Sequence, residues 1–406
     1  MIFKLIKNEL IKLMKRPKTW IVFALFAVAV LGGTYLNYID SKQMSEYHSP
    51  QGRLDNINSN INYLNQENEY LKSTNTEEAK MELSRNQESI NILEEEKKVQ
   101  EEALKHSDDP DYWKVTLNKE KETVEQELKN CVYDEEKAHY NKRLKEINNY
   151  LDNNIKPIED WEFDGFNSNN HLMLVFGMAI LAAGIAVFMS DIVSGESTPA
   201  TFKFLLVQPV SRAKIILSKF VAVVVTVVSM IGGLELLVFG AISLFTGLDG
   251  AKMPQIIGTR FEWDYSNAIQ NGGNPSLKEV VDSGILSTRG TAFVESFLLQ
   301  LLFIIACCAL VFLISSIFKS SMTTMAISVI ICVASSIIFM ATSLKKVAHL
   351  VFLNYGATPS VVGGDIAQLY NNPIFSVGLG ISLMCGTIII SYILATLIFN
   401  KKDMLI

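Results

Sequence analysis

A polar, basic segment between two long apolar runs carries the most distinctive spacing of functional groups in this chain. It extends from Asp191 to Lys219 and reads DIVSGESTPATFKFLLVQPVSRAKIILSK. The stretch Thr201–Leu206 predicts a short helix flanked by apolar residues, and Pro209 predicts its end. Ser211 can cap a following helix through its hydroxyl group. That helix would run directly into an apolar stretch, so a displacement of the segment would move a membrane helix.

The end of this segment carries groups for contact with charged surfaces. Arg212 and Lys214 can anchor at lipid head groups or pair with acids on a partner protein. A rigid element that is attached to a span can transmit force, so this segment is a candidate for an energy-coupling element. A generic cytoplasmic loop is the simpler alternative interpretation of the segment.

Motifs for catalysis and nucleotide binding are missing from the sequence. It contains no GxxxxGK[ST] loop to hold phosphates and no HExxH pair for a metal ion. Its five histidines are scattered, and its five cysteines form no CxxC pair of the kind used in zinc or redox sites. We therefore predict a protein that is not an enzyme and binds no cofactor of its own. Any energy from ATP would have to come from another protein.

Three polar residues interrupt the apolar runs. A carboxylate in hydrocarbon is costly, so such a residue usually faces a cavity or a partner. Glu235 is therefore a candidate for a substrate path or gate, and a polar group satisfied by a neighbouring span is the alternative. We expect Glu295 at the membrane interface and Gln300 in a hydrogen bond between helices.

The composition divides the chain into two unlike parts. Of the 406 residues 49% are hydrophobic, yet residues 41–170 carry 17 basic and 29 acidic side chains. This segregation predicts an all-α membrane protein with one large aqueous domain. Six runs approach the roughly 20 residues that a membrane-spanning helix needs. The predicted spans are Trp20–Tyr38, Leu172–Ser190, Ile215–Phe245, Ala292–Ile317, Met322–Ser343 and Ile374–Phe399.

The distribution of Lys and Arg predicts the orientation of these spans. With six spans, the basic N-terminus, the polar segment, Lys319 and the C-terminal Lys401 and Lys402 fall on one side, which is expected to be cytoplasmic. Lys345 and Lys346 are exceptions. We expect a multi-pass protein of a bacterial cell membrane with both termini in the cytoplasm. Membrane lipid is an expected partner and nucleic acid is not, because the basic residues flank apolar runs rather than forming a stripe on a folded surface.

Residues 1–18, before the first transmembrane helix (residues 19–39), have apolar side chains at helical spacing with lysines opposite. This pattern predicts an amphipathic helix in the membrane interface, and an ordinary basic flank is the alternative. Residues 40–170 predict an extracytoplasmic helical hairpin with coiled-coil-like seams. Its tip is expected near Pro110, with each arm about 60–75 Å long at 1.5 Å per residue. A recognition role and a plain solvated spacer both remain open for this domain.

The polar segment resembles the coupling segment of the permease subunits of ABC-2-type exporters. The similarity rests on Glu196, Ala200-Thr201, Leu205-Leu206, Pro209–Arg212 and Lys219. The N-terminal helix and the C-terminal residues Phe399–Asp403 are similar to the same family. The resemblance covers the membrane portion, namely the first span and residues 171–406, which hold five further spans and coupling segment 191–214.

This resemblance implies a permease that forms the translocation pathway of an ABC exporter and couples to a separate cytoplasmic ATPase. It further implies a second copy or a related permease as partner, and ATP and Mg²⁺ bound by the ATPase. The residues that the resemblance assigns to the coupling contact are Glu196, Thr201, Leu205, Leu206, Pro209, Val210, Ser211 and Arg212. A peptide or an amphiphilic compound is the expected cargo. A membrane sensor or scaffold that binds an envelope partner through residues 40–170 is the alternative.

Overall fold

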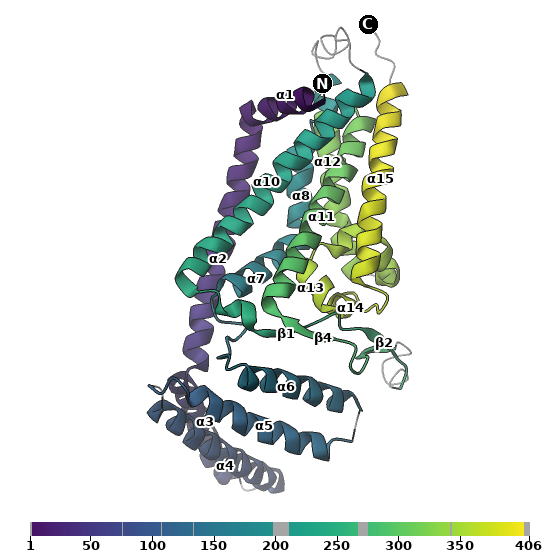
Figure 1. Ribbon diagram of the computed structural model, residues 1–406. Coiled ribbons are helices and arrows are strands. Elements are labelled where there is room, and N and C mark those ends of the chain that lie inside the picture. The colour runs from purple at the N-terminus through teal and green to yellow at the C-terminus, as the bar shows by residue number, and fades with distance from the viewer. Residues whose placement is uncertain are drawn as a thin grey trace.

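Long apolar segments form the tall helical part of the molecule (Figure 1). The computed structural model describes residues 2–74, 76–106, 108–132, 134–197, 211–266, 275–341 and 343–401. Within these residues, five single helices are long and apolar enough to cross a membrane, and they coincide with five of the predicted spans. They are α2 (Pro17–His48), α10 (Arg212–Thr246), α11 (Arg289–Ile317), α12 (Ser321–Ala341) and α15 (Val377–Lys401).

The remaining predicted span, Leu172–Ser190, is a bent pair of helices. α7 (Gly165–Gly177) and α8 (Ile180–Met189) meet at an angle of 64° and count as a sixth span only if they are taken together. Gly177 lies directly against the backbone of Gly356, where a side chain would collide with the carbonyl oxygen. The hydroxyl group of Ser336 donates to the Met178 carbonyl, which the break leaves free.

Helix α11 is the centre of the packed core. Of its most apolar stretch 61% is buried, against 11% for α2. Helices α8, α10 and α15 pack around it, and Phe303, Cys307 and Phe312 are fully buried there. The loop between α12 and α15 covers one end of this core with short helices. These are η3 (Ser343–Leu350), η4 (Phe352–Tyr355), α13 (Thr358–Gly363) and α14 (Ile366–Leu369).

The N-terminal segment forms a separate helix, α1 (Ile2–Lys15), that crosses the top of α2 in Figure 1. Pro17 begins α2, and the side chains of Thr19 and Trp20 donate to the last carbonyls of α1. The predicted helix is therefore confirmed. Part of its apolar face, including the buried Leu13, packs on the core. Its place in the membrane interface stays a prediction.

The insertion after α2 is helical, but the single long hairpin that the sequence predicts is wrong. Two hairpins form instead, and Pro110 lies in the link between them rather than at a tip. Thr76 accepts a hydrogen bond from the Ala79 amide and thereby begins a new helix. The first hairpin pairs α3 (Pro50–Thr74) with α4 (Glu77–Lys105), and the second pairs α5 (Tyr112–Asn130) with α6 (Asp134–Asp152).

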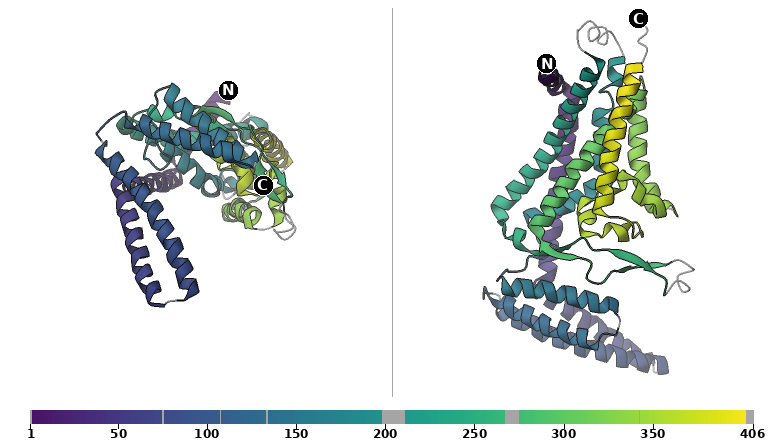
Figure 2. Two further views of the ribbon diagram at one scale, coloured as in Figure 1. Left: turned by 90° about the horizontal axis from the view of Figure 1, so that it is seen from below. Right: turned by 45° about the vertical axis from the view of Figure 1, so that its right-hand side comes forward.

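The two hairpins have different surroundings. The α3/α4 hairpin projects sideways beyond the spans, whereas the α5/α6 hairpin lies across them (Figure 2). The second hairpin shares a buried apolar cluster with the loop after α10. The cluster contains Leu117, Val124 and Ile147 of the hairpin and Met253 of the loop. Lys145 of α6 also pairs with Asp282 at 2.7 Å. The second hairpin is thus fixed to the loop that joins α10 and α11.

In the described residues of the loop between α10 and α11, four short strands form that were not predicted from the sequence. β1 (Pro254–Ile257) pairs with β4 (Ile285–Thr288), and β2 (Phe261–Asp264) pairs with β3 (Ser276–Glu279), both antiparallel. A short helix, η2 (Asp249–Lys252), precedes them. The chain is mostly helical, at 80%, so the strands add a small ribbon to an otherwise helical membrane fold.

Candidate coupling site

The candidate site lies at the end of the molecule that carries α1 and the last turn of α15, the top of Figure 1. We call this the termini end. Thr201, Leu205, Leu206, Pro209 and Val210 lie outside the described residues. The two flanks of the segment are described: residues 191–197, which contain the short helix η1 (Ser194–Ser197), and residues 211–219 at the start of α10. Glu196 belongs to η1.

The first flank is tied to the junction of α1 and α2 by Asp191. Its carboxylate accepts hydrogen bonds from Lys18 at 2.9 Å and from Arg16 at 3.5 Å. The Lys18 ammonium also donates to the Ser190 hydroxyl at 3.0 Å. These side chains are about one-third exposed, so water screens the attraction and the pairs orient the flank more than they stabilise it.

The same flank is fixed to the end of α11 by a buried serine. The Ser315 hydroxyl oxygen accepts from the backbone amides of Val193 and Ser194, each at 3.1 Å. The hydroxyl group in turn donates to the Ser190 carbonyl at 3.2 Å. Because Ser315 is fully buried, no water replaces these bonds when the side chain is shortened. The start of the segment therefore follows α11 closely.

The second flank begins at Ser211, which is the N-cap residue of α10 as predicted. Its side chain makes no cap hydrogen bond, so the predicted hydroxyl cap is wrong. Arg212 instead reaches across to the end of α15, where its guanidinium donates to the Asn400 carbonyl at 3.1 Å. The last carbonyls of a helix have no partner within the helix and carry partial negative charge, which suits a cation.

An ion pair joins the second flank to α1. The Lys219 ammonium lies 3.0 Å from the Glu9 carboxylate, and the two side chains are only 2% and 13% exposed. Lys12 binds the other oxygen of Glu9 at 3.0 Å. Burial raises the pKa of Glu9, but the two lysines outweigh burial and hold it below its ordinary value. Of the ion pairs described at the termini end, this one is the most deeply buried.

These contacts connect the segment to several helices. Its first flank is bonded to α11 and to the junction of α1 and α2, and its second flank is bonded to α1 and α15. A displacement of the segment would pass to several spans at once, as a coupling element requires. Arg212 is among the residues predicted from the sequence, whereas Glu9 and Ser315 are not. A single acid inside the lysine-rich N-terminal helix was the available signal for Glu9.

Glu235 lies away from this end, buried between α10 and α11. The Gln300 amide donates to one of its carboxylate oxygens at 3.1 Å, which confirms the predicted hydrogen bond between helices. The other oxygen of Glu235 and the carbonyl oxygen of Gln300 have no partner in the described part of the chain. A pathway role for Glu235 stays a prediction. Glu295 is exposed near the start of α11.

Fold and site together define a multi-pass helical membrane protein with a polar segment bonded to several spans. The chain belongs to a family described as ABC-2 family transporter protein, whose sequence model matches residues 3–404. The match confirms the resemblance and includes the helical insertion. No curated protein and no solved structure matches the chain. The family is the transmembrane component of ABC transporters, so the chain is a permease subunit, and an ABC ATPase is its implied partner.

Proposed function

We propose that this permease is driven by a separate cytoplasmic ATPase that acts on residues 191–219 and exports an amphiphilic or peptide cargo. The observation that carries the proposal is the bonding of both segment flanks to α1, α2, α11 and α15. The ATPase binds ATP and Mg²⁺. The basic residues at the termini end support a cytoplasmic position for this end and for both termini.

Coupling in this proposal is a difference in preference between two states of the ATPase. ATP closes a pair of ATPase subunits, and the closed pair binds one position of the segment more tightly than the other. The attached spans move with it as packed units. Two permease copies, or this permease and a related one, form the pathway between them. Membrane lipid surrounds the spans, whose outer faces are apolar and exposed.

Substitutions in the segment test the coupling. Leu205→Glu and Arg212→Glu are expected to lower ATPase binding and ATP-driven transport at least tenfold while the protein still inserts into the membrane. Co-purification with the ATPase from the native membrane, followed by ATP hydrolysis in proteoliposomes, measures both. Lys252→Glu, on the opposite end of the molecule, is a matched charge control. Normal ATPase binding and transport by the Leu205 and Arg212 variants would contradict the assignment.

The side of the membrane is tested separately. A cysteine placed at Gln208, in a variant that lacks the native cysteines, should react with an impermeant maleimide only from the cytoplasmic side. A cysteine at Asp152, in the insertion, should react only from outside. Labelling of position 208 from outside would place the segment beyond reach of any cytoplasmic ATPase.

A further inference from the structure

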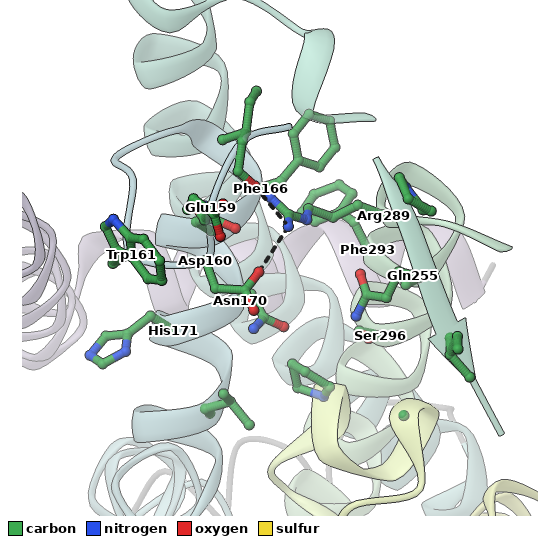
Figure 3. A pocket seen from close by; sticks show the side chains of 18 of the residues that line it. Glu159, Asp160, Trp161, Phe166, Asn170, His171, Gln255, Arg289, Phe293 and Ser296 are labelled. Carbon is green, nitrogen blue, oxygen red and sulfur yellow. Dashed lines mark hydrogen bonds and ion pairs between the residues drawn. The ribbon is translucent and has the colours of Figure 1, made fainter. Parts of the chain in front are cut away.

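A cavity of about 530 Å³ lies at the opposite end of the molecule, which we call the insertion end. It is enclosed by the outer parts of α2, α7 and α11, by α6 of the insertion, and by the loop of residues 153–164. Figure 3 shows Trp161 and His171 on one side of it, with Arg289 and Phe293 on the other. We call this cavity the chamber. The insertion forms its wall on the side that faces away from the spans.

The lining of this chamber carries an excess of negative charge. Three basic side chains face six carboxylates. The basic residues are Lys142, Arg143 and Arg289, and the carboxylates belong to Asp40, Glu146, Glu159, Asp160, Glu162 and Asp365. The excess matters because a chamber with walls of one sign concentrates ions of the other sign.

The three basic groups are already bound to acids. Arg289 lies 2.8 Å from Asp160, and Lys142 lies 3.5 Å from Glu279. Arg143 lies 2.7 Å from Glu120 and also contacts Glu146. Such pairing leaves little positive charge to balance the remaining carboxylates.

Three of the remaining carboxylates lie on three separate elements. Asp40 is on α2, Glu159 is in the loop after α6, and Asp365 lies between α13 and α14. Within the described residues, none of the three has a basic side chain at ion-pair distance. The chamber therefore presents unpaired negative charge from several directions.

A second, apolar cavity adjoins this chamber on the side of the spans. It measures about 250 Å³ and lies between α2 and α7, where Gly33, Leu36, Leu172, Val175 and Phe176 line it. Asn37, Asp40 and His171 line both cavities. The polar chamber is thus continuous with an apolar groove on the flank of two spans.

We propose that the chamber and the groove form one binding site for an amphiphile with a positively charged amine head. The amine lies among Asp40, Glu159 and the neighbouring carboxylates, and the hydrocarbon lies in the groove between α2 and α7. Access is lateral, from the outer leaflet of the bilayer. The assignment of this ligand as cargo rests on the proposed function, whereas binding itself does not.

The pKa shifts of carboxyl groups in the chamber wall are consistent with a cationic head group. Burial raises the pKa of Glu159, and the nearby carboxylates of Glu162 and Asp160 raise it further, while Arg143 opposes them. Burial also raises the pKa of Asp365. Lys142 opposes this shift of Asp365, and Glu279 adds to it. Because both carboxyl groups are less stable as anions than in water, a bound amine would add positive charge where the anions need it.

One feature of the chamber favours an anion instead. The Arg289 guanidinium is 12% exposed, and one of its nitrogens, Nη1, has no hydrogen-bond partner in the described part of the chain. Asp160 already occupies the other terminal nitrogen. A head group with a negative charge would meet this single nitrogen and several repelling carboxylates, so the balance of charge favours the amine.

The probe is dodecyltrimethylammonium, tested on the full chain in lipid nanodiscs without any ATPase. Trp161 stacks on His48 at the chamber wall and reports binding by fluorescence, after Trp20, Trp113 and Trp263 are replaced by Phe. We expect saturable binding of this probe, at least tenfold tighter than that of dodecyl sulfate or of tetramethylammonium. Equal or tighter binding of dodecyl sulfate would overturn the proposal, as would no saturable binding at all.

Two variants separate the head site from the groove. Asp40→Asn combined with Glu159→Gln should weaken dodecyltrimethylammonium binding at least tenfold, while Asp152→Asn, an exposed acid outside the chamber, should change it less than twofold. Val175→Phe fills the groove without adding a second tryptophan, and it should weaken the long-chain probe but not the weak binding of tetramethylammonium. An unchanged affinity in the double variant would overturn the proposal.

A further pair of probes distinguishes a lipid-like amine from a peptide. Dodecylamine carries one charge, and N-dodecanoyl-trilysine amide carries a basic peptide head on the same hydrocarbon chain. Tighter binding of the peptide identifies a cationic lipopeptide as the ligand class, and tighter binding of the amine identifies a lipid-like compound. Since the ATPase is absent, a failure of binding leaves the coupling assignment unaffected, and a failure of coupling leaves this binding result intact.

Discussion

The two ends of this permease differ in how their charged side chains are paired. At the termini end, Lys219 and Glu9 are buried as a pair, and Asp191 is shared between two basic residues. At the insertion end, Asp40, Glu159 and Asp365 line a chamber, and in the described residues no basic side chain lies at ion-pair distance from them. Paired charges hold elements together, whereas unpaired charges around a cavity attract a ligand. The contrast indicates that ion pairs hold the elements of the termini end together, whereas the insertion end is suited to bind a ligand.

The largest expected effect is the loss of the buried pair at the termini end. Lys219→Met leaves the Glu9 carboxylate buried with only the exposed Lys12 as partner. We expect the free energy of unfolding to fall by about 3 kcal/mol, the lower part of the range for a broken buried pair. Unfolding by heat or denaturant in detergent measures it.

Two controls sharpen this result. Lys12→Met, which removes the half-exposed partner, should cost about 0.5 kcal/mol or less. The double variant Lys219→Met with Glu9→Leu should recover most of the lost stability, because no unpaired charge stays buried. If Glu159→Gln in the chamber proves as destabilising as Lys219→Met, the contrast between the two ends is wrong.

A smaller loss is expected for Ser315→Ala. The backbone amides of Val193 and Ser194 lose their shared acceptor and remain buried, at a cost of about 2 kcal/mol. Ser328 provides a matched control, because it is equally buried and its hydroxyl has no hydrogen-bond partner among the described residues. Ser328→Ala should be close to neutral in the same unfolding assay. Equal effects of the two substitutions would show that Ser315 does not fix the segment.

Sequence reasoning found the spans and the segment but not the contacts that join them. Apolar run length is a local property, so five single helices and the bent α7/α8 pair lie where the sequence predicts spans. The 64° bend depends on the meeting of Gly177 with Gly356, which are far apart in sequence. Heptad spacing within residues 40–170 predicts helices but not which helix pairs with which. Two hairpins therefore replaced the expected one.

The same limit applies to both sites. Glu9 and Lys219 are separated by more than 200 positions, and the chamber draws its lining from α2, α6, α7, α11 and the loop near α13. Each residue is an ordinary surface type when read alone. Only the packing of distant elements reveals that Glu9 and Lys219 form an ion pair, and that several carboxylates of the chamber have no such partner among the described residues.

A still smaller effect on stability is expected for Asp191→Asn. The pairs with Lys18 and Arg16 are about one-third exposed, so the free energy of unfolding should fall by about 0.5–1 kcal/mol. ATP-driven transport should fall more than stability does, because the flank loses its link to α1 and α2. Transport and unfolding are measured on the same preparation, with Asp152→Asn as the control. A change in stability without any change in transport would reduce Asp191 to a packing role.

The last and smallest effect is a difference in pH response between the ends. The pKa of Glu9 is below its ordinary value in the folded protein, so its stabilising contribution is present above its unfolded pKa. That contribution is lost only as the pH falls through the lowered, folded value. Glu159 and Asp365 behave in the opposite sense. Their raised pKa values mean that they take up protons first on acidification, and that protonation favours the folded state.

Mild acid should therefore weaken amine binding before it disturbs the pair at the termini end. Protonation removes the charge that holds the head group, so the affinity for dodecyltrimethylammonium should fall as the pH drops through the raised pKa of Glu159. Trp161 fluorescence titrations at a series of pH values measure this, and unfolding under the same conditions monitors the Glu9–Lys219 pair. Glu159→Gln should flatten the pH profile of binding because position 159 no longer titrates. Loss of folding stability at a higher pH than loss of binding would reverse the order and remove the distinction between the two ends.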